Sequence, residues 1–167
     1  MHTVEETIDI GVPIRDAYDQ WTQFEQFPKF MEGVKEVRQI DDRRLAWRAE
    51  ILGKDVNWDA EITHQVPDDT IAWRSTSGPQ QDGTVKFVRT GPASTRLVLR
   101  LTYEPQSASD KTASALGLVT ARVKGDLKRF KKFIEERGVA TGQWRGEIRG
   151  AHVTRSDRGG SPGAMGG

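Results

Sequence analysis

The chain contains no cysteine and only three histidines among its 167 residues. Without cysteine sulfur, disulfide bonds and thiolate chemistry are excluded. No metal-ligand spacing links His2, His64 and His152. Phosphate loops, nucleophile elbows and zinc motifs are also missing. We therefore expect no metal site and no cofactor.

Long apolar runs are absent too, so no segment is suited to span a membrane. Residues 1–9 lack the basic start and the apolar stretch of a signal peptide, which makes the cytoplasm the expected location. The formal charge is only +1, because 25 basic residues face 24 acidic ones. Such a balance produces no global field that attracts nucleic acid, and no nucleic-acid partner is expected.

Glycine is unevenly distributed along the chain. Residues 138–167 hold nine of the 17 glycines and a single aromatic residue, Trp144. A Gly-rich, mostly polar segment cannot bury enough apolar surface to offset the entropy of ordering it. We therefore expect one folded domain over residues 1–137, followed by a disordered tail over residues 138–167.

Alternating apolar and polar residues dominate the first two thirds of the chain. In the clearest segment, Trp58, Ile62 and His64 fall on one face, while Asp59 and Gln65 fall on the other. This period of two is typical of antiparallel strands covered on one side. The short turns between segments predict a meander, with strands at residues 3–12, 34–40, 44–52, 55–66, 70–76, 84–89 and 95–104.

A long helix is predicted over residues 112–137, where apolar residues recur every three or four positions. Ser109 or Asp110 is expected to cap its start, and Gly138 to end it. At ~1.5 Å per residue the helix is about 39 Å long, enough to cover the apolar face of the sheet. Two short helical segments are expected between the first and second strands, the first of them opened by Pro13. The fold class is therefore α+β.

Several runs resemble a known superfamily. They are the opening Pro13–Trp21 and Phe27–Met31, the strand runs Val56–Ile62 and Ile71–Ser75, and the ending Leu127–Glu135. Over about residues 3–137 the chain resembles the bacterial branch of the polyketide cyclase/dehydrase and lipid-transport superfamily, also called START-like or SRPBCC proteins. The resemblance implies a helix-grip fold, in which a curved seven-stranded antiparallel sheet wraps around a long C-terminal helix. It also implies a hydrophobic ligand held in an internal cavity: a lipid, a quinone, an isoprenoid or an aromatic polyketide.

The predicted ligand site lies between the sheet and the long helix. Trp47, Trp58 and Trp73 share the apolar face of three consecutive strands, where they either wall a pocket or form ordinary core. His64, on the same predicted face, is the candidate to orient a ligand carbonyl or to act as a general base; its alternative role is a plain hydrogen bond near a strand end. The expected ligand-binding residues are Phe30, Met31, Trp47, Trp58, Ile62, His64, Trp73, Ser75, Phe87, Leu99, Tyr103, Leu116, Gly117, Thr120 and Val123.

Other charged and glycine positions allow two interpretations each. Asp59 and Glu61 are expected on the solvated face, paired with basic neighbours rather than arranged for acid–base chemistry. Gly117 and Gly125 lie inside the long helix, where close approach of a ligand or a strand, or a kink, would explain them. The basic residues of this helix form either a solvated face or a surface that contacts anionic membranes; they are Arg122, Lys124, Lys128, Arg129, Lys131, Lys132 and Arg137.

Two functions from different classes follow from the resemblance: a carrier that binds a hydrophobic molecule without catalysis, and a polyketide aromatase/cyclase or dehydratase. In the aromatase/cyclases that the chain resembles, an arginine at the position of Gln65 reaches into the cavity, and a tyrosine at the position of Val34 assists. Neither an amide nor an alkyl group titrates, so these two differences favour the carrier. A chaperone-like protein-interaction module is a third alternative.

Overall fold

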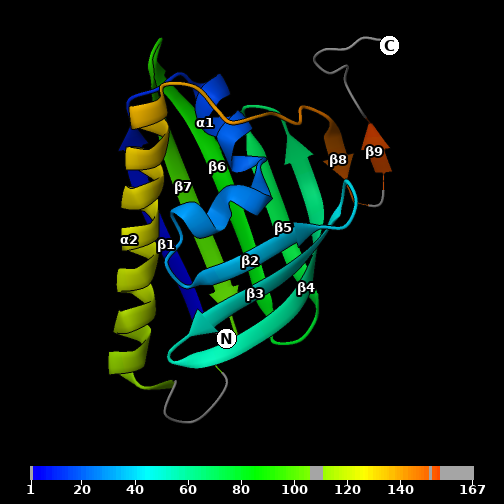
Figure 1. Cartoon of the computed structure of the whole chain (residues 1–167), viewed down its shortest axis with the longest axis vertical. Coiled ribbons are helices and arrows are strands. Elements are labelled where there is room, and N and C mark those ends of the chain that lie inside the picture. Colours follow the sequence, from blue (N-terminus) through cyan, green and yellow to red (C-terminus); the bar gives the residue numbers. More distant parts are fainter. Residues whose placement is uncertain (1, 106–110, 151, 155–167) are drawn as a thin grey trace.

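The computed structural model describes residues 2–105, 111–150 and 152–154, and its sheet is built mainly from seven strands (Figure 1). These strands are β1 (His2–Ile10), β2 (Val34–Gln39), β3 (Arg44–Ile51), β4 (Lys54–Val66), β5 (Thr70–Ser77), β6 (Gln81–Gly91) and β7 (Ser94–Tyr103). Between β1 and β2 lie the short helix α1 (Ile14–Trp21) and the 3-10 helix η1 (Phe24–Lys29). The long helix α2 (Ala113–Arg137) follows β7, and two short strands end the described chain, β8 (Glu147–Arg149) and β9 (His152–Thr154).

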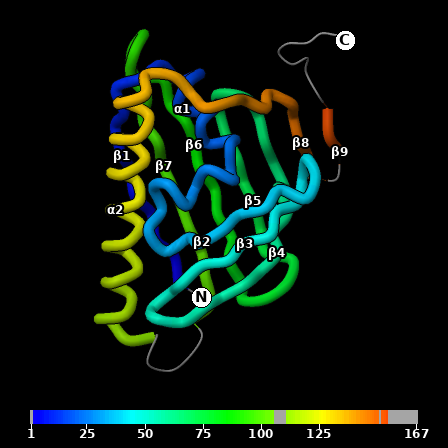
Figure 2. Tube along the Cα trace, viewed as in Figure 1, coloured from blue at the N-terminus to red at the C-terminus, as the bar shows by residue number. Residues whose placement is uncertain are grey.

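The strands lie in the order β1-β7-β6-β5-β4-β3-β2, and every neighbouring pair is antiparallel. The helices α1, η1 and α2 all lie on one side of the curved sheet, which is called the inner face below (Figures 1 and 2). This arrangement confirms the predicted helix-grip fold. The short strands β8 and β9 extend the sheet beyond the seven strands that the sequence predicted.

Cross-strand register fixes which side chains share the inner face. Directly paired residues point to the same side, so the rung Ile62–Trp73–Gly83–Leu101 runs across β4, β5, β6 and β7 on that face. On the opposite face, Glu61 pairs with Arg43 at 3.0 Å and with Arg74 at 3.1 Å. The prediction that the carboxylates of β4 meet basic neighbours on the solvated face is therefore confirmed for Glu61.

The helix α2 begins one residue later than predicted and has a different cap. The side chain of Thr112 accepts a hydrogen bond from the Ala115 amide at 3.1 Å, so the prediction of Ser109 or Asp110 as the cap is wrong. At the other end Gly138 has φ +80° and donates its amide to the Ile134 carbonyl at 2.8 Å. This left-handed residue ends the helix as predicted.

The chain after α2 belongs to the fold. It passes from the end of α2 over α1 and reaches the far side of the sheet (Figure 2). There β8 pairs with β4 beyond Glu61, where the pairing of β4 with β3 ends. Ile148 is fully buried. The prediction of a disordered tail is therefore wrong for residues 139–150 and 152–154; residues 155–167, which it also covered, lie outside the described residues.

Arg145 fastens this C-terminal segment to the domain. Its guanidinium lies 2.5 Å from the Asp19 carboxylate and 2.8 Å from that of Asp68, and it also covers the ring of Tyr18. Burial raises the pKa of Asp19 despite this partner. Gln20 adds two hydrogen bonds, with the amide and the hydroxyl of Thr141. The average composition of residues 138–167 concealed these contacts, because a few well-placed side chains carry them.

Candidate functional site

The inner face is closed at one end of α2 and more open at the other. At the C-terminal end, Leu127, Phe130 and Ile134 are buried against the aromatic side chains of α1 and η1; Phe130, for example, lies 5.1 Å from both Trp21 and Phe30 between ring centroids. In the N-terminal half, Leu116 and Val119 also belong to the apolar interior but are only half-buried. Strand residues of the inner face are half-buried as well, namely Trp58, Trp73 and Leu101. We call these five residues the half-buried apolar set.

Two tryptophans of this region are stacked across neighbouring strands. Trp47 and Trp58 are direct cross-strand partners, with ring centroids 5.6 Å apart and an interplanar angle of 6°. Trp47 is buried beneath Phe27, whereas Trp58 is half-buried. The indole Nε1 of Trp47 has no hydrogen-bond partner among the described residues. A buried donor without a partner is costly.

The third tryptophan lies against the backbone of β6. Trp73 is paired with Gly83, and a Cβ atom placed on Gly83 would lie 2.3 Å from Cζ2 of the indole. Between Trp58 and Trp73 the inner face carries small residues, Ala60 and its partner Ser75. Ser75 is also tied to its own hairpin, because its hydroxyl accepts the Gln81 amide at 3.1 Å.

The predicted orientation of His64 is wrong. A β-bulge at Thr63 shifts the register between Ile62 and His64, so every later side chain of β4 changes face. His64 pairs with Ala72 and Arg149 away from the interior, and Gln65 turns inward instead. Gln65 is 1% exposed and donates to the Tyr18 hydroxyl at 3.1 Å. His64 is therefore not placed to contact a ligand on the inner face.

A carboxylate that the sequence analysis did not select shares the inner face. Glu6 pairs with Leu99, between the inner-face residues Val4 and Ile8, and is half-buried. The alternation of β1 already contained this signal, because Val4, Glu6, Ile8 and Ile10 occupy every second position. Glu6 is thus a titratable group on the same side as the half-buried apolar set.

The remaining predicted site residues divide into three groups. Gly117 is exposed, and a Cβ atom there would meet nothing within 4 Å, so the close approach of a strand that could have explained this glycine is not found. Thr120 is half-buried and bonds the carbonyl of Leu116 within the helix. The others are buried on the inner side, namely Phe30, Met31, Ile62, Phe87, Leu99, Tyr103 and Val123.

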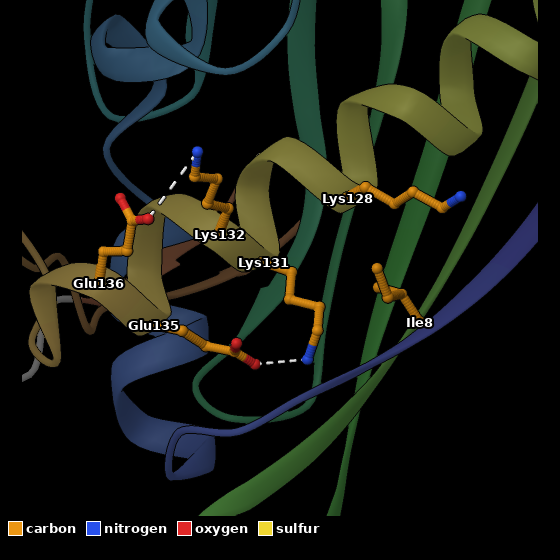
Figure 3. A pocket seen from close by; sticks show the side chains of 6 residues that line it. All are labelled: Ile8, Lys128, Lys131, Lys132, Glu135 and Glu136. Carbon is orange, nitrogen blue, oxygen red and sulfur yellow. Dashed lines mark hydrogen bonds and ion pairs between the residues drawn. The ribbon is translucent and has the colours of Figure 1, made fainter.

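A surface hollow of about 590 Å³ lies between β1 and the C-terminal half of α2 (Figure 3). It is lined by Ile8 and by five charged residues of α2. Lys131 lies 2.5 Å from Glu135, and Lys132 lies 3.9 Å from Glu136. Two further basic residues of α2 are also paired, Arg122 with Glu32 and Arg129 with Asp126. These pairs favour the interpretation of a solvated helix face over a membrane-binding one.

Two classes of site are not found in the part of the chain that the structure describes. No three His, Asp or Glu side chains gather there in a group that could hold a metal ion. No helix there is both long and apolar enough to cross a membrane.

Comparison with known proteins agrees with this geometry. Residues 10–132 match the family described as polyketide cyclase/dehydrase and lipid transport, and the chain belongs to this family. An uncharacterized 17.2 kDa protein of Streptomyces lincolnensis is 46% identical over 149 residues, which cover 89% of this chain and 99% of that protein.

Solved structures show the same architecture. A Deinococcus radiodurans protein is 30% identical, with a TM-score of 0.65 over 83% of this chain and 100% of its own. The Zhui aromatase/cyclase of a Streptomyces species has a TM-score of 0.68 over 85% of this chain and 98% of its own, at 15% identity. A START superfamily protein of Mycobacterium smegmatis has a TM-score of 0.64 over 82% of this chain and 97% of its own, at 20% identity. At such identities these last two similarities concern the fold alone.

Proposed function

We propose that the protein binds a hydrophobic small molecule between the N-terminal half of α2 and the inner face of the sheet, without changing it chemically. The observation that carries this proposal is the half-buried apolar set. Five large apolar side chains point into the fold yet keep contact with solvent, whereas Leu127, Phe130 and Ile134 at the other end of α2 are buried. A hydrophobic ligand would complete their burial, which is worth roughly 25 cal/mol for each Å² of apolar surface removed from water.

The absence of catalysis is supported by the polar groups of the interior. Gln65 faces inward at the position where the resemblance implies an arginine, and its amide cannot transfer a proton. His64, the general base that the sequence suggested, points away. Glu6 is the carboxylate that a cyclase would have available on this face, and it therefore serves as the test of that alternative.

The experiment is a thermal-shift screen with fatty acids, quinones, isoprenoids and aromatic polyketides, followed by mass spectrometry of each hit after incubation. A ligand at a hundred times its dissociation constant stabilises the fold by ~2.7 kcal/mol, which for a chain of this size is a shift of roughly 5–10 °C. We expect at least one such hit and unchanged ligand afterwards.

Two substitutions in the same helix form a matched pair. Leu116 faces the sheet and is half-buried, whereas Leu118 is 63% exposed. Leu116→Lys should abolish the shift caused by the hit, and Leu118→Lys should retain it. Turnover of a poly-keto substrate that is lost in Glu6→Gln would replace the carrier by a cyclase. No shift with any ligand class would favour the protein-interaction module.

A further inference from the structure

Gly83 lies in close contact with the indole of Trp73 on the inner face. A Cβ atom on Gly83 would lie 2.3 Å from Cζ2 and 2.5 Å from Cε2 of the indole, and 2.9 Å from Cδ2 of Leu101. These distances are far below van der Waals contact. The indole therefore lies directly on the backbone of β6, in a space that any larger residue would fill.

Backbone conformation does not explain this glycine. Among the described residues the glycines with positive φ are Gly53, Gly78, Gly138 and Gly150, and Gly83 is not one of them. It sits inside β6, paired with Trp73 on one side and Leu101 on the other. Alanine would be compatible with such a strand position, so the glycine is explained by the close approach of the ring.

This contact covers one side of the Trp73 indole. The indole lies against Gly83, yet the side chain as a whole remains half-buried. Trp58 is likewise half-buried, and one face of its ring is stacked on Trp47. The small residues Ala60 and Ser75 lie between these two positions on the inner face. The inner face of the sheet therefore carries only short side chains between these two tryptophans.

We infer that Gly83, by letting Trp73 lie down on β6, determines the depth of the ligand site and gives it a preference for flat aromatic rings over saturated rings. The inference rests on the proposed function and identifies the residue pair that governs its specificity. On the inner face, a Cβ atom at position 83 points away from the sheet, so alanine would push the indole toward α2 and into the space that the ligand needs.

The test uses two probes with the same skeleton, 2-naphthol and trans-2-decalol, titrated against the wild-type protein by calorimetry. Stacking adds roughly 0.5–1.5 kcal/mol beyond burial for an aromatic pair, so wild type should bind 2-naphthol about two- to thirteenfold more tightly. Gly83→Ala should weaken 2-naphthol binding by about tenfold, in line with the effect of overfilling a packed space. Thr84→Ala, next to it but on the other face of β6, is the matched control and should bind like wild type.

A second variant separates the proposed contact from general damage. In Trp73→Leu the ring is gone, so the preference for 2-naphthol should disappear, and adding Gly83→Ala should change affinity by less than about twofold. Circular dichroism verifies the fold of each variant. If Gly83→Ala does not fold, the inference is judged by whether Trp73→Leu alone loses the preference for 2-naphthol. Equal binding of both probes by wild type, or an undiminished effect of Gly83→Ala without Trp73, would overturn the inference and leave the proposed function intact. If wild type bound neither probe nor any ligand of the wider screen, the proposed function itself would fail.

Discussion

Ending the chain after Gly138 should destabilise the domain strongly, because residues 139–154 complete the fold. The truncation removes Ile148, which is fully buried, and the pairing of β8 with β4. Loss of a buried isoleucine side chain alone costs about 2–5 kcal/mol. It also removes Arg145, so Asp19, whose side chain is only 5% exposed, keeps just the Arg15 guanidinium at 3.8 Å. An uncompensated buried charge costs about 3–5 kcal/mol, and the new exposure of Asp19 reduces that figure.

Together these losses amount to at least ~4 kcal/mol, because the two sites are coupled and do not add fully. For a domain of this size that lowers the melting temperature by roughly 8–16 °C. Thermal unfolding followed by circular dichroism measures the shift. The matched control ends after Thr154, keeps all described contacts of the C-terminal segment, and should melt like the full chain. A fall of less than about 3 °C for the shorter chain would refute the structural role of the segment.

Three further predictions test faces, charges and caps. Trp58→Ala should lower the free energy of unfolding by about 2 kcal/mol or more, which is less than the loss of a fully buried ring would cost. Asp59→Ala should lower it by less than about 1 kcal/mol. If urea unfolding gave the reverse order, the faces of β4 would be inverted. Arg145→Ala should cost about 2–3 kcal/mol near pH 7. Burial raises the pKa of Asp19, so the folded state disfavours the ionised carboxylate. The stability contributed by protonated Asp19 is therefore present at low pH and is lost as the pH rises. The cost should therefore shrink toward pH 4, and an equal cost at both pH values would contradict this role. Gly138→Ala should cost about 1 kcal/mol because φ is +80°, and an unchanged melting temperature would argue against the left-handed cap.

The regular parts of the fold were predictable from local pattern. Alternation located the seven main strands, and the three- to four-residue period located α2 to within one residue of its start. Even Glu6 could have been found, since it lies at an inner-face position between Val4 and Ile8. A carboxylate within an apolar alternation looks like a break in the pattern, although Glu6 occupies an inner-face position of β1.

The irregular parts were not predictable. The bulge at Thr63 adds one residue to β4, and nothing in the residues from Ile62 to Gln65 marks it. One such residue reverses the assignment of His64 and Gln65, because side chains alternate between faces. The prediction for the C-terminal segment was wrong for another reason. The contacts of this segment depend on partners such as Asp19 and Gln20 that are more than a hundred positions away in the sequence.

These two irregularities together bear on the choice between carrier and cyclase. The bulge turns Gln65 inward, to the position where the resemblance implies a working arginine. In this chain, however, Gln65 is bonded to Tyr18 and lies beside Ile148 of β8, and it is almost completely buried. Its partner Ile71 is also fully buried, whereas Trp73, two residues further along β5, is half-buried. The interior thus changes from closed to accessible between these two rungs, and position 65 lies on the closed side. A polar group at position 65 therefore lies apart from the half-buried apolar set, and in the proposed site that set would hold the ligand mainly by burial.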